Sequence, residues 1–400
     1  MTETGRGMID FAGHFMPALA AATTKVRAGN RLAGRRVGIA LTLEPKTACL
    51  VEAVVSLGAD VAVFGSGHST KQAVVDALVE RGISVFAEAG ATRERAGELR
   101  ELFIDTRIEF LCDDGASIAR RIHRERRDVL DDLRGIAEET TSGVRPLRVM
   151  EAEGVLMVPC VAVNDARTKV LFDNVYGTGQ SVVMAVLDAT NMQMSGSDVV
   201  VVGYGMVGRG IAAVARGLGA RVVVTEIEPV AALAAFHDGF QVRPIDDAVM
   251  DARFVFTATG IGHSLTADHV ELMNEGTVIA VGGAGPPEFD PTIGPELVRG
   301  AEVRPNVTAW TTTGGKTVFV VADGYCANTT AGEGNPIEIM DLSLALQMRA
   351  LDFLAIGDLA AGVHVLPKEI EDEVAASQLE AAGIVIDKPS QDQIRAALSW

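Results

Sequence analysis

Side chains able to move protons gather in one stretch of the chain, VNDARTKVLFDN at residues 163–174. It contains Asn164, Lys169, Asp173 and Asn174, and it follows an apolar run, LMVPCVAV. One interpretation is a surface turn in which Asn and Asp cap a helix. The other is an active-site loop, because a buried lysine beside a carboxylate can have its pKa tuned for proton transfer. Spacing alone leaves both interpretations open.

Two further segments pose the same choice. CDDG at residues 112–115 contains Asp114, and EETTSG at residues 138–143 contains Glu139. Each places carboxylates or hydroxyls where a predicted strand ends, and α/β proteins bind ligands at the carboxyl ends of their strands. Each segment is therefore either a surface turn or part of an active-site loop.

A glycine-rich turn predicts a dinucleotide site. The run VVVVGYGMVGRG at residues 199–210 has the G-x-G-x-x-G spacing and leads into a helical pattern. A second strand, RVVVTEI, then ends in an acid placed to bind ribose hydroxyls and to repel a 2′-phosphate, which favours NAD over NADP. The alternative is a turn that binds no ligand. The predicted cofactor residues here are Gly203, Gly205, Met206, Val207, Gly208 and Glu226.

The elements that position these residues alternate between strands and helices. RRVGIAL, DVAVFG, ISVFAEA and EFLCDD are typical of buried parallel strands, and the alternation resumes after residue 198. We therefore predict an α/β fold with two doubly wound, Rossmann-like parallel-sheet domains. Residues 1–180 plus 338–385 would form the substrate-binding domain, with the helical C-terminal segment returning to it. Residues 181–337 would bind NAD, and residues 386–400 would form a short tail.

Composition excludes several classes of function. The formal net charge of −18 disfavours nucleic acid and anionic lipid as partners, and no apolar run is long enough to span a bilayer. The basic run RRIHRERR at residues 120–127 adjoins acids and is typical of a solvated helix face. Four scattered cysteines without a CxxC pair predict reduced thiols and no metal site. With no signal peptide, the expectation is a cytoplasmic protein.

Taken together, these segments resemble the adenosylhomocysteinase (S-adenosylhomocysteine hydrolase) family from about residue 30 to residue 385. The resemblance rests on PKTACLVEAVVSLGADV, LCDDGASIARRIH, GIAEETTSGV, VNDARTKVLFDNVYG, GYGMVGRG, VTEIEP and GVHVLPKEIEDEVA. It implies that NAD oxidises a nucleoside's 3′-hydroxyl, that the 5′-substituent is eliminated, and that water adds before the ketone is reduced again. The first domain would hold the nucleoside, and members form dimers or tetramers.

The resemblance also implies roles for individual residues. Lys169 and Asp173 would handle the 3′-hydroxyl proton with support from Asn164, while Glu139 would contact the ribose hydroxyls. Asp114 would act near C5′. Beside the glycine turn and Glu226, the residues implied in NAD binding are Thr140, Thr141, Ser142, Asn174, Thr259 and Asn328.

The chain departs from the family where the base and C5′ are handled. Thr42 stands where the family has a catalytic histidine, and Glu44 and Lys46 replace residues that help to recognise adenine. These three positions and Asn335 are our candidate substrate-binding residues. Asn335, Thr178, and Gly283 or Ala284 replace two further histidines and a cysteine. The family's C-terminal arm, which reaches a neighbouring subunit's NAD, has no counterpart before Trp400, and this weakens the expectation of a tetramer.

Three hypotheses follow from these departures. The leading one is a divergent enzyme that keeps 3′-oxidation and elimination but adds no water back, which gives a 4′,5′-unsaturated nucleoside. Losing a histidine proton carrier can cost roughly 10²–10⁴ in rate, and His68 or His263 could substitute, although a lone loop histidine is more often structural. The alternatives are an ordinary adenosylhomocysteinase and an inactive homologue that binds NAD or a nucleoside.

Overall fold

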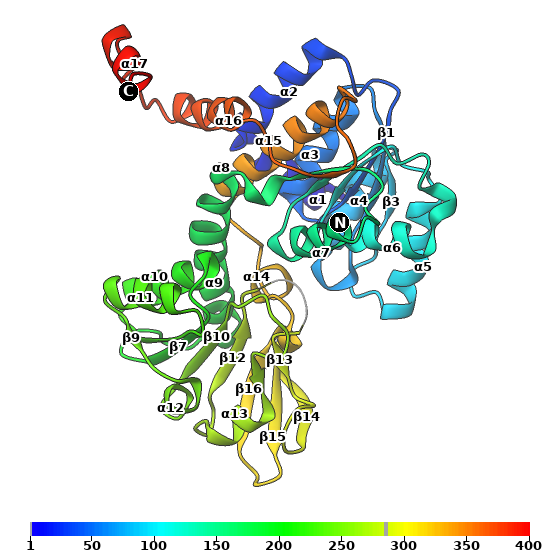
Figure 1. Cartoon of the computed structure of the whole chain (residues 1–400). Coiled ribbons are helices and arrows are strands. Elements are labelled where there is room, and N and C mark those ends of the chain that lie inside the picture. Colours follow the sequence, from blue (N-terminus) through cyan, green and yellow to red (C-terminus); the bar gives the residue numbers. More distant parts are fainter. Residues whose placement is uncertain (1, 284–286) are drawn as a thin grey trace.

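The computed structural model describes residues 2–283 and 287–400, and it consists of two lobes, each built around a twisted sheet (Figure 1). The first sheet is parallel throughout. Its strands, in spatial order, are β17 (Gly362–His364), β6 (Pro159–Ala162), β5 (Gly135–Glu138), β4 (Phe110–Asp113), β1 (Arg36–Ala40), β2 (Asp60–Phe64) and β3 (Ser84–Phe86).

Helices cover both faces of this sheet, as expected when strands carry buried side chains on both sides. Val37 and Ile39 of β1 pack into a core with α1–α4 and α15, whereas Ala40 joins a second core with α5–α7. The helices are α1 (Thr2–His14), α2 (Pro17–Gly29), α3 (Pro45–Ser56), α4 (Gln72–Glu80), α5 (Arg93–Ile104), α6 (Ser117–Glu125), α7 (Thr141–Ala152) and α15 (Ile337–Leu354). The short 3₁₀ turns are η1 (Gly67–Ser69), η2 (Arg127–Val129) and η3 (Val163–Asp165).

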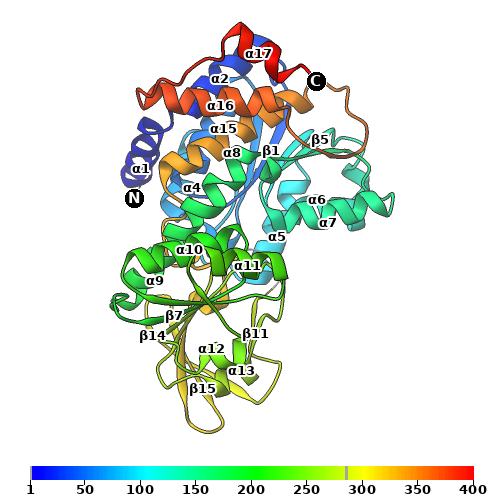
Figure 2. The same cartoon turned by 60° about the vertical axis from the view of Figure 1, so that its left-hand side comes forward.

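The C-terminal segment returns to the first domain. Asp341 of α15 accepts hydrogen bonds from the backbone N–H groups of Ala18 (2.9 Å) and Leu19 (2.8 Å), so it caps α2 from 323 residues away in sequence. α16 (Lys368–Ala381) packs beside α2, and α17 (Gln391–Ala397) projects from this end of the molecule (Figures 1 and 2). The C-terminal helices α15 and α16 thus pack against the first domain, and the division into 1–180 plus 338–385, 181–337 and a tail at 386–400 stays a proposal.

The second sheet is parallel through its centre, and one edge is antiparallel, which the sequence analysis did not predict. Its strands, in spatial order, are β14 (Leu297–Arg304), β15 (Val307–Thr312), β16 (Thr317–Val321), β12 (Val278–Val281), β10 (Phe254–Thr257), β7 (Asp198–Val202), β8 (Arg221–Thr225) and β9 (Gln241–Val242). β11 (Leu265–Thr266) pairs with β13 (Phe289–Asp290). The helices are α10 (Met206–Gly217), α11 (Pro229–His237), α12 (Ile245–Val249), α13 (Ala267–Leu272) and α14 (Ala327–Thr330), with a 3₁₀ turn η5 (Ala322–Gly324).

Two segments join the domains. One is a continuous helical stretch made of α8 (Arg167–Val170), the π-helical segment η4 (Phe172–Gly177) and α9 (Thr178–Thr190). The other runs through residues 331–336 into α15. Both pass the carboxyl ends of the first sheet's strands, where the candidate residues lie.

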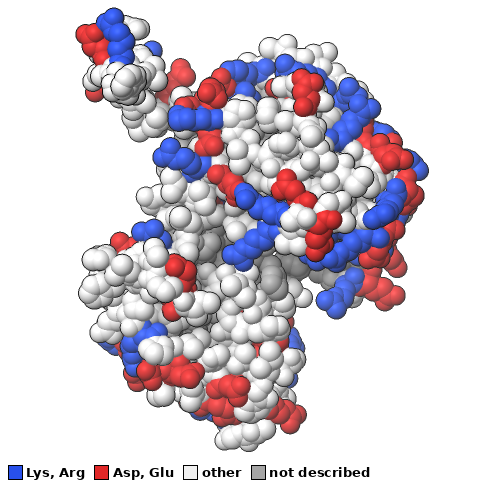
Figure 3. All heavy atoms as spheres, in the orientation of Figure 1, with Lys and Arg blue, Asp and Glu red and all other residues white. Residues whose placement is uncertain are grey.

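Charge is mixed on the face shown in Figure 3, where acidic and basic side chains alternate without a broad basic patch. In the basic run, Arg126 pairs with Glu101 at 3.1 Å and with Asp128 at 2.9 Å. Among the described residues, no helix combines the length and hydrophobicity that a membrane crossing requires.

Candidate active site

Strands β4 and β5 end side by side, and each leads into a pair of adjacent acids. The first acid of each pair accepts hydrogen bonds from backbone N–H groups. Glu138 Oε2 accepts from Ala116 N at 2.9 Å, and its Oε1 accepts from Thr140 N at 3.0 Å. Asp113 Oδ2 accepts from Ala119 N at 2.8 Å, in the first turn of α6. Burial raises the pKa of Asp113 to about 7, and burial together with the charge of Asp113 raises the pKa of Glu138. These acids fix the loops that carry their neighbours.

The second acids, Asp114 and Glu139, lie close to Lys169. Glu139 Oε1 is 3.7 Å from Lys169 Nζ. Burial raises the pKa of Asp114, while a hydrogen bond from Thr140 and the charge of Lys169 oppose this rise. The structure therefore brings together acids from two strands and a lysine that the sequence analysis could only place separately.

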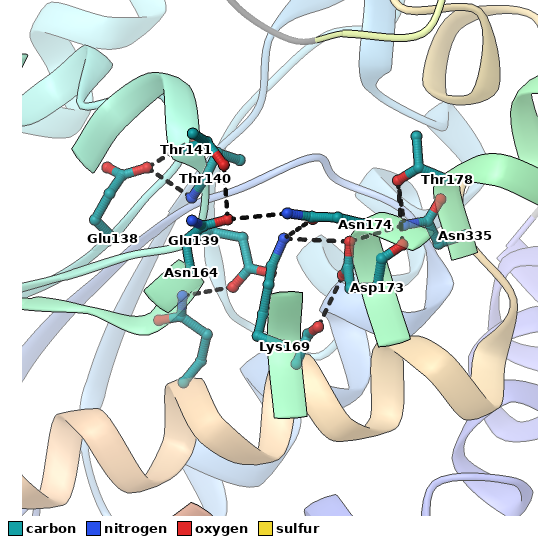
Figure 4. A network of polar contacts seen from close by, with 12 residues as sticks. Glu138, Glu139, Thr140, Thr141, Asn164, Lys169, Asp173, Asn174, Thr178 and Asn335 are labelled. Atoms are coloured by element: carbon teal, nitrogen blue, oxygen red, sulfur yellow. Dashed lines mark hydrogen bonds and ion pairs between the residues drawn. The ribbon is translucent and has the colours of Figure 1, made fainter. Parts of the chain in front are cut away.

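Lys169 and Asp173 lie one helical turn apart, and the π-helical widening at η4 brings Asn174 to the same lysine. Such π segments redirect side chains and are common at functional sites. Lys169 Nζ donates to Asn174 Oδ1 at 2.9 Å and to Asp173 Oδ1 at 3.2 Å. All three side chains are buried, and Figure 4 shows them in one continuous polar network. This geometry contradicts the interpretation of residues 163–174 as a plain surface turn.

Helix α15 supplies two polar residues that the sequence analysis missed. Ser343 Oγ donates to Asp173 Oδ2 at 2.8 Å, and Gln347 Nε2 donates to Glu139 Oε2 at 2.6 Å. The two residues lie one turn apart and are fully buried. Their signal in the sequence was two polar residues four positions apart within an apolar helical run, LSLALQM. Gln347 Oε1 has no partner among the described residues although it is buried.

The surroundings of Lys169 act on its pKa in opposite directions. Burial lowers the pKa of Lys169, but the charges of Asp173, Glu139 and Asp114 outweigh it and raise that pKa overall. Burial raises the pKa of Glu139 to about 7, against the opposing charge of Lys169. Near neutral pH, Lys169 is therefore an ammonium, and among its direct neighbours Glu139 can gain or lose a proton.

Asn164 links the start of α7 to the π segment. Its Oδ1 accepts from Thr141 Oγ1 at 3.0 Å and from Asn174 Nδ2 at 3.3 Å. Thr140 Oγ1 lies 3.0 Å from Ser142 Oγ, within hydrogen-bond distance. These five residues, predicted from separate motifs, thus form one border of the network.

The glycine turn fits a dinucleotide. Gly203 has a φ of +94°, and a Cβ added at Gly208 would lie 2.0 Å from Gly203 O, so neither position has room for a side chain. A Cβ at Gly205 would meet nothing within 4 Å, which leaves open space at the N-terminus of α10, where pyrophosphate is favoured. Glu226 follows β8 and accepts from Tyr204 N at 2.6 Å, so its carboxylate borders the same turn. Met206 and Val207 begin α10.

Thr259 follows β10 and is held by a residue that the sequence analysis missed. Glu288 is buried, and its Oε2 accepts from Thr259 N at 2.8 Å while its Oε1 accepts from Gly260 N at 2.9 Å. A Cβ added at Gly283 would lie 1.8 Å from Glu288 Oε1, so only glycine leaves room for this carboxylate. Ala284, the other position where a histidine was expected, lies outside the described residues.

The predicted base-recognition positions form a buried ion pair at the start of α3. Lys46 Nζ lies 2.8 Å from Glu44 Oε2 and donates to Glu333 O, in the second inter-domain segment, at 2.7 Å. Burial raises the pKa of Glu44, and the charge of Lys46 opposes this. Thr42 O accepts from Thr47 Oγ1 at 2.7 Å. Glu44 and Lys46 therefore contact each other, and Lys46 also contacts the inter-domain segment.

Asn335, predicted to bind substrate, is bonded within the protein. Its Nδ2 donates to Asp173 Oδ1 and to Thr178 Oγ1, both at 3.1 Å. Its Oδ1 accepts from Ser181 Oγ at 2.7 Å and from Asn328 Nδ2 at 2.9 Å. Asn335 therefore positions Asp173 and ties Asn328 of the second domain to the proton-handling network.

The two candidate replacement histidines lie apart from this network. His263 is exposed, with Nδ1 at 2.7 Å from Asp290 Oδ2. His68 stacks on Tyr325, with ring centroids 4.4 Å apart. Within residues 2–283 and 287–400, no three His, Cys, Asp or Glu side chains gather in a metal-binding arrangement.

Comparison with known proteins shows the family of the chain. Residues 1–129 match the family described as S-adenosyl-L-homocysteine hydrolase, and residues 174–334 match its NAD binding domain. An adenosylhomocysteinase from Thermotoga maritima is 42% identical over 402 residues, covering 100% of both chains. An S-inosyl-L-homocysteine hydrolase from Methanopyrus kandleri is 41% identical over 409 residues, covering 100% of this chain and 96% of the relative.

Proposed function

Because this chain belongs to the adenosylhomocysteinase family of NAD-dependent enzymes, we propose that it oxidises a nucleoside at C3′ and eliminates the 5′-substituent as water. The product is a 4′,5′-unsaturated nucleoside. One observation carries this proposal: the proton-handling residues form one buried network, whereas Thr42, Glu44, Lys46 and Asn335 carry no imidazole, and the side chains of Glu44, Lys46 and Asn335 bond to the protein itself.

The glycine turn is the part of the chain that would hold NAD. When bound, NAD supplies reversible hydride acceptance at the nucleoside's C3′. Gly205 leaves room for the pyrophosphate, and Glu226 accepts the ribose hydroxyls and disfavours a 2′-phosphate. Thr259 and Asn328 are held by Glu288 and Asn335, so both are positioned before the cofactor binds.

Lys169 and Glu139 handle the 3′-hydroxyl proton. The Lys169 ammonium hydrogen-bonds the 3′-oxygen, and the hydroxyl proton passes to Glu139, whose pKa of about 7 suits reversible transfer near neutral pH. Asp173 keeps Lys169 in place, since it is itself fixed by Ser343 and Asn335. When the ketone is reduced at the end, Glu139 returns the proton.

Asp114 assists the elimination at C5′. We assign to this buried carboxyl, whose pKa burial raises, the proton that the leaving hydroxyl takes up. The 3′-ketone acidifies the C4′ proton, which passes into the carboxylate network as the C5′–O bond breaks and the C4′–C5′ double bond forms. The nucleoside loses one hydrogen from C4′ and one hydroxyl from C5′ as water, and the hydride taken from C3′ returns to it, so no net oxidation occurs.

Hydrolysis of an S-nucleosyl homocysteine is the second candidate function. The observation that favours it is the full-length similarity to relatives named adenosylhomocysteinase and S-inosyl-L-homocysteine hydrolase. In this reaction water would add back to C5′ after homocysteine leaves. Both candidates use Lys169, Glu139 and Asp114, and they differ in the leaving group and in the last addition.

Product analysis separates the candidates. The NAD-loaded protein is incubated with adenosine, inosine, guanosine and S-adenosylhomocysteine, and the products are identified by mass spectrometry. Loss of one water from a nucleoside, without release of homocysteine, is the expected result. Homocysteine release as the main reaction would replace the proposal with hydrolysis. No product from any substrate, with NAD bound, would favour a binding protein. A dimer or tetramer in the same preparation would agree with our proposal of a homo-oligomer.

A further inference from the structure

One amide side chain lies in the apolar core of the first domain and bonds to an acid of the candidate site. Gln347, on α15, is fully buried, and its neighbours Leu346 and Met348 belong to the hydrophobic core. Its Nε2 donates to Glu139 Oε2 at 2.6 Å, whereas its Oε1 is buried and has no partner within residues 2–283 and 287–400. A buried amide oxygen without a partner destabilises the fold. Packing alone would therefore favour an apolar residue here, and the use of the amide lies at Glu139.

Helix α15 is anchored on both sides of this glutamine. Towards its N-terminus, Asp341 accepts the two backbone hydrogen bonds that cap α2. At its C-terminus, a Cβ added at Gly135 of β5 would lie 2.8 Å from Leu354 Cδ2, so the helix packs closely against this strand. Strand β5 leads directly to Glu139, and the amide therefore reaches the acid from a support that is fixed relative to it.

The two carboxylate oxygens of Glu139 have different surroundings. Oε2 accepts the amide hydrogen bond, whereas Oε1 lies 3.7 Å from Lys169 Nζ and, in the described part of the chain, has no hydrogen-bond partner. A proton is therefore taken up most readily at Oε1. A neutral N–H that donates to a carboxylate favours the ionised form, because protonation would weaken that hydrogen bond.

Other groups also act on the ionisation of Glu139. The charge of Lys169, from α8, lowers its pKa, while the charges of Asp173, from η4, and of Asp114, after β4, raise it. Cys112 of β4 stays a neutral thiol, because burial and the charge of Glu139 raise the pKa of that thiol. All of these groups remain when the α15 amide is removed, so its own contribution can be measured.

From these contacts we propose that Gln347 is a positioning residue, which holds Glu139 by Oε2, leaves Oε1 to the substrate hydroxyl and favours the ionised carboxylate that accepts the hydroxyl proton. The inference rests on the proposed function in one respect, the proton transfer to Glu139. It is the same for dehydration and for hydrolysis, because both begin with oxidation at C3′.

A titration of Glu139 tests this role without any substrate. Gln347→Met removes the amide and keeps a similar side-chain length. The NAD-loaded wild type and variant are titrated from pH 5 to 10 while the infrared band of protonated carboxyl groups is recorded, and Glu139→Gln identifies the part of the band that Glu139 contributes. The midpoint should rise from about 7 by about one pH unit in Gln347→Met, because a hydrogen bond to a charged group is worth about one to two pH units.

Activity gives a second readout. The kcat/KM is measured over the same pH range with whichever of adenosine, inosine, guanosine and S-adenosylhomocysteine the wild type turns over. At pH 7 it should fall about fivefold in Gln347→Met, because the ionised fraction of Glu139 drops from about one half to about one tenth. The loss should shrink as the pH rises and Glu139 ionises in the variant as well.

Gln378→Met is the matched control, because Gln378 Nε2 donates to Glu338 O of α15 at 2.6 Å, outside the network. It should leave the midpoint and kcat/KM unchanged. A wild-type midpoint in Gln347→Met, with normal NAD content, would overturn the inference, and a lower melting temperature with that same midpoint would assign Gln347 a structural role only. If Gln347→Met does not fold, Gln347→Leu, which also lacks a donor, takes its place. If the wild type turns over none of the substrates, the proposed function fails, while the titration still decides the role of Gln347.

Discussion

Replacing Lys169 with methionine removes the positive charge from the centre of the site while keeping most of the side-chain volume. The change deletes the hydrogen bonds to Asp173 (3.2 Å) and Asn174 (2.9 Å) and the 3.7 Å ion pair with Glu139. Breaking a buried ion pair from one side typically costs about 3–5 kcal/mol. Protonation of Glu139 relieves part of that cost, so we expect the free energy of unfolding to fall by roughly 2–4 kcal/mol.

The effect of Lys169→Met on activity should exceed its effect on cofactor binding. Turnover should fall by roughly 10²–10⁴, because positioned proton transfer contributes about that much. The NAD content should stay near that of wild type, since the glycine turn and Glu226 are untouched. Wild-type activity should rise with pH through about 7 as Glu139 ionises. In the variant this rise should move to higher pH, because the charge that lowers the pKa of Glu139 is gone.

The assay combines product formation from pH 6 to 9, NAD content after gel filtration, and denaturant unfolding. Lys316→Met is the matched control, because Lys316 Nζ donates to Glu271 O in the second domain, away from the network. A variant that keeps wild-type turnover, or that loses turnover only because NAD is lost, would refute the role assigned to Lys169.

Three further predictions concern packing, pH and the cofactor. Gly143→Ala should lower the free energy of unfolding by about 1–3 kcal/mol, because its Cβ would lie 2.2 Å from Glu138 Cδ. Gly97→Ala, with nothing within 4 Å, should raise it by about 0.5–1 kcal/mol; equal effects in urea unfolding would contradict this. Burial lowers the pKa of His123 from 6.5, so the stability that its neutral ring provides is complete above pH 6.5 and is lost as pH falls through the lowered value. His123→Gln should make the melting temperature depend less on pH below pH 6.5, and an unchanged dependence would contradict this role of His123. Glu226→Ser should weaken NAD and admit NADP in fluorescence titrations, whereas unchanged selectivity would show that other groups exclude the 2′-phosphate.

Sequence reasoning could find the parts of the site whose residues lie close together in the sequence. The glycine turn has its strand, helix and acid within about thirty residues, and the structure shows a steric reason for Gly203 and Gly208 and open space at Gly205. Lys169 and Asp173 are four positions apart on one helical stretch, so their proximity follows from helix geometry alone. The π-helical widening that turns Asn174 to the same lysine is a finer feature that periodicity does not reveal.

The remaining parts depend on contacts between distant segments. Gln347 lies 208 residues from Glu139 in sequence, and only the return of α15 to the first sheet brings the two together. Asn335 was predicted at the substrate because a family histidine has that position, but its amide is used fully within the protein. The antiparallel edge of the second sheet also escaped prediction, since its strands lack the alternation with helices that marks the parallel ones.

Isotope labelling tests the central claim, oxidation at C3′ followed by loss of the C4′ proton and of water, most directly. Adenosine and inosine carrying deuterium at both C3′ and C4′ are incubated with the NAD-loaded protein, and the product is examined by mass spectrometry. Our account predicts a product that has lost one water and the C4′ deuterium but keeps the C3′ deuterium, because the hydride returns to the carbon it left. A dehydrated product that retains the C4′ deuterium, or that has lost the C3′ deuterium to solvent, would contradict the account.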